Sequence, residues 1–374
     1  MKRVFSTVAK ALAAAVGAAA LWPVRMPEGR ITDWPRHAVE PAASLRVLWV
    51  GHSLMNHRDP HAKPPRNLLE TVGKFADARG KRYEALDHTL FGSPLALLWR
   101  GSPHTFSRSE PAMAARRKEF ISQAKDIDAV VMTELLPVRD SLQGEHSAYY
   151  AQAFYCGVAR QNPRARVYLY ETWSHLFGAN PQGRYGPVSS FDWSKRLAED
   201  RVSVERIADL AATGQVPAPG MFARLQTLAN SSSHCTPGEP IFIIPVGSVF
   251  RALAQVLKEE TLRFADRRLV VGDLFANPYT SWPDGWPLRS PLSPQAEAAQ
   301  LSQLQLRLPN EPFDDIHPSH LGIYVAALVH FATLFAASPL GLPNDIPGLP
   351  QDTAYRLADL VWQVVRNDPR TGVR

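Results

Sequence analysis

The stretch that decides the fold is residues 45–54, which read LRVLWVGHSL. A short run rich in Leu, Val and Trp that ends at a glycine is typical of a strand buried on both faces of a sheet. Gly51 permits the tight turn that would end the strand. Ser53 then lies just past the strand's carboxyl end, which is the edge where open α/β sheets bind their ligands.

Similar apolar runs recur along the chain and alternate with helical patterns. This alternation predicts an α/β fold whose parallel sheet is covered by helices on both faces. Further strands are expected at 82–88, 129–133, 167–170 and 241–246, with a weaker one at 268–271. Helices are expected at 65–79, 115–124, 146–160, 194–212, 319–337 and 353–365.

The composition is that of an ordinary globular protein. The chain has 374 residues, of which 45% are hydrophobic and 20% charged, and its formal net charge is +6. No Lys/Arg-rich run or nucleic-acid motif accompanies this charge, so a nucleic-acid partner is not expected. The positive charge either serves solubility or suits an anionic envelope or acidic polymer.

The N-terminus carries a targeting pattern. Lys2, Arg3 and Lys10 precede the apolar run 11–24, which is short for a membrane span and contains small residues suited to cleavage. Residues 1–24 are therefore expected to be a signal peptide, or else an uncleaved anchor to the inner membrane. Either alternative places the rest of the protein in the periplasm or outside the cell.

The remaining chain divides into three expected parts. Residues 25–43 have the composition of a linker, and residues 44–340 are expected to form the main domain, with insertions at about 177–240 and 276–312. Residues 341–374 form a C-terminal extension with one amphipathic helix. The two cysteines, Cys156 and Cys235, either pair in an oxidising compartment or are two buried small side chains.

A second chemical signal lies near the end of the main domain, where residues 314–319 read DDIHPS. An imidazole base needs a carboxylate on its other nitrogen to fix the tautomer and stabilise the imidazolium. Asp314 lies three residues before His317, close enough to meet it across one turn. Pro318 can start the helix that follows, and Gly322 lets that helix pack closely.

These two motifs together resemble the SGNH/GDSL hydrolase superfamily. Gly51-His52-Ser53-Leu54 is similar to the block that carries the family's nucleophile, and Asp314 to Pro318 is similar to its Asp-x-x-His-Pro block. The resemblance covers about 45–337 and implies a flavodoxin-like three-layer α/β/α sandwich. It also implies a Ser53–His317–Asp314 triad, with Asp314 preferred over Asp315. The Gly-x-Ser-x-Gly elbow of the α/β-hydrolases is absent.

The resemblance also suggests an oxyanion hole, with two departures from the family pattern. The N–H groups of Ser53 and Gly92 would be donors. Where the family has an asparagine after the third strand, this chain has Thr133-Glu134. Thr133 is the expected substitute donor, and the Glu134 carboxylate is expected to turn away because an anion there would repel the oxyanion. His52 is the other departure, since the family often has Asp at this position.

The expected reaction is ester hydrolysis through an acylated Ser53, without a cofactor. An acetyl ester on a polysaccharide is the expected substrate. The alternatives are an O-acyltransferase, a lipase or thioesterase, and a non-catalytic carbohydrate-binding or assembly protein on the same fold. No metal is expected, because the spacing of the cluster His52, His57, Asp59 and His61 matches no helical or zinc-binding pattern, and solvated or substrate-facing histidines are expected instead. The expected substrate-binding residues are His52, Asn56, Trp282 and Trp286, with Trp193 as a further possible sugar-stacking face.

Overall fold

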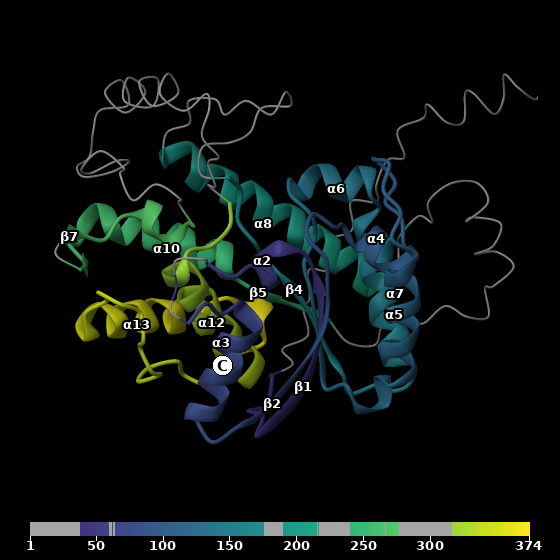
Figure 1. The fold of residues 1–374 in the computed structure, drawn as a ribbon, viewed down its shortest axis with the longest axis horizontal. Helices are drawn as coiled ribbons and strands as arrows, with labels where there is room; N and C mark the ends of the chain where they lie inside the picture. The colour runs from purple at the N-terminus through teal and green to yellow at the C-terminus, as the bar shows by residue number, and fades with distance from the viewer. Residues whose placement is uncertain are drawn as a thin grey trace, which may run out of the picture. The chain divides into compact units, whose positions relative to one another are not determined.

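The centre of the fold is a five-stranded parallel sheet in the order β2-β1-β3-β4-β5 (Figure 1). The computed structural model describes residues 38–59, 62, 64–175, 190–214, 216, 240–265, 267–276 and 316–374, all within the compact unit Ile31–Arg374. The strand order is the flavodoxin-like one, which confirms the expected α/β fold class. The strands are β1 (Ser44–Gly51), β2 (Arg82–Thr89), β3 (Ala129–Met132), β4 (Arg166–Tyr170) and β5 (Ile241–Ile244).

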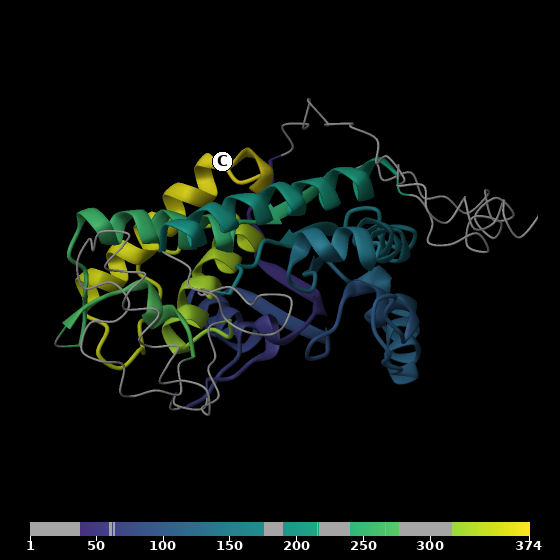
Figure 2. The same ribbon diagram turned by 90° about the horizontal axis from the view of Figure 1, so that it is seen from above.

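Helices cover both faces of this sheet (Figures 1 and 2). On one face lie α3 (Leu68–Ala78) and α12 (His320–Phe335), and on the other lie α4 (Leu95–Arg100), α5 (Pro111–Ser122) and α7 (Ser147–Ala159). The remaining described helices are α2 (Ser53–Asn56), α6 (Val138–Gly144), α8 (Ser190–Thr213), α10 (Val246–Glu259) and α13 (Gln351–Asn367), with the 3-10 turns η1 (Ala124–Asp126), η3 (Val271–Leu274) and η4 (Pro369–Thr371).

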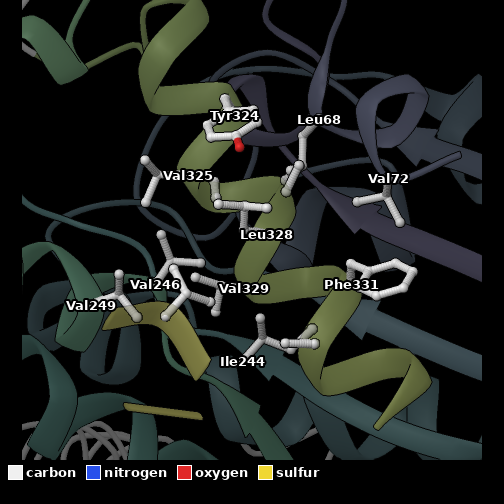
Figure 3. Close-up of a cluster of buried hydrophobic side chains, with 14 of the residues drawn as sticks. Leu68, Val72, Ile244, Val246, Val249, Tyr324, Val325, Leu328, Val329 and Phe331 are labelled. Atoms are coloured by element: carbon white, nitrogen blue, oxygen red, sulfur yellow. The ribbon is translucent and has the colours of Figure 1, made fainter. Parts of the chain in front are cut away.

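Helix α12 is the centre of the hydrophobic core. Every one of its residues is buried, as expected for a helix that is apolar all round. Figure 3 shows Leu68 and Val72 of α3 on one side of α12, with side chains of β5 and α10 on another. The helix is therefore packed on several sides. The segment that leads into it carries His317.

One expected strand is wrong. Residues 268–271 do not extend the central sheet. Instead, β7 (Arg267–Arg268) pairs antiparallel with β6 (Arg263–Phe264), and the chain then turns into η3. The reason is local, because the Asp273 carboxylate accepts the N–H of Val270 at 2.8 Å and bends the chain away from an extended path.

Helix α8 and the C-terminal residues belong to the same core as the sheet. Helix α8 lies in the first expected insertion, yet it packs against α7 and β5. Leu357, Val361 and Val365 of α13 are buried in the common core, and Val39 donates its N–H to the carbonyl of Gly372 at 2.8 Å. The extension 341–374 therefore covers hydrophobic surface of the main domain.

Two clusters of charged side chains tie the C-terminus to α8. Arg201 donates to the buried carboxylate of Glu171 at 3.1 Å and also bonds Asp368. Arg370 donates to both carboxylate oxygens of Asp209, at 2.6 and 3.1 Å. Burial raises the pKa of Glu171 to about 7, although Arg201 opposes this shift. These ion pairs are partly or fully desolvated, so breaking one leaves an uncompensated charge.

Several expectations fall on residues outside the described ones. They are the leader 1–24, most of the linker 25–43, Cys235, Trp282, Trp286, Asp314 and Asp315. Cys156 is described and is buried in α7. Within the described part of the chain, no helix has both the length and the apolar character needed to cross a membrane.

Candidate active site

Ser53 is the first residue of α2 and follows the end of β1. Figure 1 shows α2 at the end of β1. Strand β1 has β2 on one side and β3 on the other, so the chain changes direction across the sheet at β1. Ser53, which follows β1, lies at this point. Open α/β sheets bind ligands at such a switch point. A side chain at Gly51 would place its Cβ only 2.5 Å from the methyl carbon of Thr133. This explains why the residue two positions before Ser53 is a glycine.

His52 caps α2 rather than facing a ligand. Its side chain is buried, with Nδ1 3.5 Å from the N–H of Leu54 and Nε2 2.9 Å from the carbonyl oxygen of Glu134. Burial is the main cause that lowers the pKa of His52 to about 4, with the hydrogen bond to the Glu134 carbonyl opposing the shift and the nearby His317 adding to it. The ring is therefore neutral at pH 7, so Nε2–H donates to Glu134 while Nδ1 accepts from Leu54. Both nitrogens are used in holding the turn.

His317 is brought to the same edge from the far end of the domain. Its ring stacks on that of His57, which directly follows α2, with centroids 4.6 Å apart and planes 20° apart. It also lies 6.1 Å from the ring of Phe91 in the loop after β2. The fold thus places His317 against both the helix that Ser53 begins and the loop that contains Gly92.

The main chain around His317 is firmly bonded. Ala276 donates its N–H to the His317 carbonyl at 2.8 Å, and Trp173 donates its indole N–H to the carbonyl of Ile316, also at 2.8 Å. Pro318 pairs with Phe275 as an isolated bridge. These bonds attach the histidine segment to the ends of β4 and η3, so its position depends on the sheet rather than on a single loop.

The loop that carries Gly92 is attached directly to the turn before Ser53. Leu90 donates its N–H to the carbonyl of Gly51 at 2.9 Å, and Arg108 donates to the carbonyl of Phe91 at 2.8 Å. Gly92 has a positive φ of 59°, a backbone conformation that favours glycine. The Gly92 N–H therefore belongs to a well-anchored loop beside Ser53, and its role as an oxyanion donor stays a prediction.

Thr133 and Glu134, which follow β3 where an asparagine was expected, both have partners within the fold. Thr133 is fully buried, and its hydroxyl donates to the carbonyl of Tyr170 at 3.3 Å. A hydroxyl has one proton to donate, so a role for Thr133 in the oxyanion hole stays a prediction that requires this hydroxyl to turn. The Glu134 carboxylate accepts the N–H groups of Leu95 and Leu135 at 3.2 and 2.7 Å.

The charge of Glu134 is also reduced by its surroundings. Burial raises its pKa to about 7, while its hydrogen bonds act in the opposite direction. A carboxyl group that is partly protonated near neutral pH opposes an oxyanion less than a fully ionised one would.

Other candidate binding residues are placed as follows. The Asn56 amide donates to the hydroxyl of Thr89 at 2.6 Å, which ties α2 to the end of β2. Trp193 is buried against Phe250 and donates its indole N–H to the carbonyl of Ser174, so it is a core residue and not a sugar-stacking face. No cluster of three or more potential metal ligands occurs in the described parts of the chain.

Two further residues, Phe91 and His57, lie beside His317 although the sequence did not predict this position for them. Phe91 is 51% exposed, and an exposed aromatic ring beside the candidate base is suited to contact a ligand. The sequence offered a weak signal for Phe91, since it directly precedes Gly92. For His57 it offered only the local cluster of histidines, because the contact with His317 is made through the fold.

Comparison with known proteins finds no protein-family model that matches and no matching curated protein. Among solved structures, the chain is similar to a DUF4886 family protein from Bacteroides uniformis, with 13% identity, a TM-score of 0.44, and coverage of 87% of this chain and 95% of the other. It is also similar to a GDSL-like lipase from Parabacteroides merdae, with 12% identity, a TM-score of 0.37, and coverage of 80% and 99%.

A third structure is a variant of an acetyl xylan esterase from Geobacillus stearothermophilus, with 10% identity, a TM-score of 0.35, and coverage of 82% and 100%. At these identities and TM-scores we transfer no activity from the matched proteins.

Proposed function

We propose that this protein is an exported serine esterase of the SGNH/GDSL type, with Ser53 as nucleophile and His317 as base. The observation that carries the proposal is the stacking of His317 on His57, at the end of the helix that Ser53 begins. The serine and the histidine are far apart in sequence, and the fold brings their segments together at one edge of the sheet. We assign Asp314 as the carboxylate that orients His317.

The proposed reaction follows from these roles. His317 takes the proton of Ser53 as its oxygen attacks the ester carbonyl, and the N–H groups of Ser53 and Gly92 stabilise the tetrahedral oxyanion. The imidazolium then gives its proton to the departing alcohol, which leaves an acyl ester on Ser53. Water, deprotonated by His317, attacks this ester, and the acid is released as the proton returns to Ser53.

We propose short acyl esters of carbohydrates as the substrate class. Two observations support this choice: the targeting pattern in residues 1–24, which would place the protein near envelope or extracellular glycans, and the exposed ring of Phe91 beside the base. Aromatic faces of this kind can pack against a sugar ring. Export is tested by cell fractionation, and full-length chain free in the cytosol would contradict it.

The function is tested with p-nitrophenyl esters of increasing acyl length and with acetylated xylan, using Ser53→Ala as the matched inactive variant. Turnover of the acetyl ester and release of acetate from the glycan, both lost in Ser53→Ala, are expected. A clear preference for long-chain esters without acetate release would favour a lipase. Acetate appearing on an added sugar instead of in solution would favour an acyltransferase.

The choice between the two neighbouring aspartates has its own test. Asp314→Ala is expected to lower kcat strongly, though less than His317→Ala, because the imidazole loses its orientation and the stabilisation of its charge. Asp315→Ala is the matched control and is expected to stay close to wild type. The reverse order of the two variants would reassign the orienting carboxylate.

A further inference from the structure

We propose that His57 and Asp59, which follow α2, form a brace that positions His317 relative to Ser53. This inference rests on the proposed function and deepens it, because it names residues that hold the base in place. The two side chains contact the histidine segment on both sides of Pro318: one contacts the ring of His317, and the other contacts the main chain of His320.

The first contact is the stacked pair of imidazole rings. His57 is fixed to the nucleophile's helix by its own N–H, which donates to the carbonyl of Ser53 at 2.7 Å. Its ring lies almost parallel to that of His317, with centroids 4.6 Å apart. One short chain of contacts therefore runs from the main chain of Ser53 through His57 to the imidazole that would accept the Ser53 proton.

The second contact is a hydrogen bond to the start of α12. Asp59 is only 6% exposed, and its carboxylate accepts the N–H of His320 at 2.8 Å. That N–H is one of the first in the helix and has no partner within it, and a carboxylate at this end is also favoured by the helix dipole. Ser319 satisfies the N–H of Gly322 in the same turn. Asp59 and the N-cap Ser319 thus together hold the first turn of α12, which begins three residues after His317.

Such a brace matters because general-base catalysis needs the imidazole nitrogen within hydrogen-bond reach of the serine hydroxyl. The stacked His57 ring restricts the tilt of the His317 ring, and Asp59 restricts the shift of its main chain. Phe91 approaches the same imidazole at a 44° tilt, which stacks less closely than His57 does. His57 and Asp59 are positioning residues, since neither is assigned a proton transfer or a contact with the substrate.

The test compares His57→Ala, which removes the ring, with His57→Phe, which keeps a planar ring able to stack. We expect kcat for p-nitrophenyl acetate to fall about three- to tenfold in His57→Ala, the size of one aromatic pair, while KM changes less than about twofold. His57→Phe is expected to return kcat to within about twofold of wild type. Tyr355→Ala is the control, because it truncates an exposed aromatic side chain on α13.

The outcomes distinguish a failure of the brace alone from a failure of the proposed function. If wild type turns over ester and His57→Ala matches its kcat, the brace is wrong and the esterase stands. If His57→Phe loses as much as His57→Ala, stacking is not the cause and the brace is wrong as stated. If wild type neither turns over ester nor reacts at Ser53 with a fluorophosphonate, the proposed function fails and the brace fails with it. Circular dichroism at equal concentrations confirms that the variants are folded.

Discussion

The sharpest prediction concerns Gly322, in the first turn of α12. A Cβ at this position would lie 2.0 Å from the carbonyl oxygen of Leu274 and 3.0 Å from the Cβ of Pro318. The Leu274 carbonyl accepts the N–H of Ser319 at 2.9 Å, so a methyl group must push the two segments apart and weaken that bond. The sequence-based expectation that Gly322 permits close packing is confirmed by this geometry.

The magnitude follows from three opposing effects. Overpacking costs about 1–3 kcal/mol, and loss of the hydrogen bond costs about 0.5–1.5 kcal/mol. The better helix propensity of alanine returns about 1 kcal/mol. We therefore expect Gly322→Ala to lower the free energy of unfolding by about 0.5–3.5 kcal/mol. Because the displaced segment carries His317, we also expect kcat to fall about 10- to 100-fold, in line with the cost of a 1 Å misplacement.

Urea unfolding followed by circular dichroism measures the stability, and p-nitrophenyl acetate hydrolysis measures kcat. The matched control is Gly73→Ala in the interior of α3, where the nearest atom to an added Cβ is a ring carbon of Tyr83 at 3.2 Å. Its stability is expected to stay within about 1 kcal/mol of wild type, since the gain in propensity offsets a mild contact. A Gly322→Ala protein with wild-type stability and wild-type kcat would refute the reasoning.

Three further predictions concern charge and substrate contact. Arg201→Met is expected to lower the free energy of unfolding by about 3–5 kcal/mol at pH 8, because it leaves the charge of Glu171 buried and uncompensated. The loss is expected to be smaller at pH 6, since Glu171, whose pKa is raised to about 7, can then take up a proton. Burial raises the pKa of Glu134 from 4.5 to about 7, so the folded state binds more protons than the unfolded state in this range and stability falls as pH rises. Between pH 5 and pH 8, wild type should lose about 2–3 kcal/mol more unfolding free energy than Glu134→Gln; parallel curves would contradict this. Phe91→Ala is expected to raise KM for an acetylated glycan severalfold with little change in kcat, and an unchanged KM would remove Phe91 from the substrate site.

Much of the sheet could be predicted from the sequence. Four of its strands, β1, β3, β4 and β5, are short apolar runs, and a buried parallel strand has no polar face to obscure that signal. The edge strand β2 mixes charged with apolar residues and is only partly buried, so its signal is weaker. The prediction of a strand at 268–271 is wrong because the Asp273 carboxylate binds the N–H of Val270 and turns the chain locally. Helix α10 is not among the expected helices, although its buried residues recur at helical spacing: Val246, Val249, Phe250 and Leu253. The strand expected at 241–246 includes Val246, which is the first residue of this helix.

The site was only partly predictable. Motifs made Ser53 and His317 candidates because those residues lie in a recognisable local pattern. They could not show that His52 caps α2 or that the Thr133 hydroxyl bonds Tyr170, since both outcomes depend on partners from other strands. The contact between His57 and His317 is likewise a product of tertiary structure, and no spacing rule along the chain encodes it.

The central claim, that Ser53 is a nucleophile activated by His317, is tested most directly by covalent labelling. The full chain is incubated with a fluorophosphonate, and the modified residue is identified by mass spectrometry of its peptides. We predict a single adduct on Ser53, formed at least tenfold more slowly in His317→Ala and absent from Ser53→Ala. An adduct on another serine, or labelling of Ser53 at the same rate without His317, would contradict the claim.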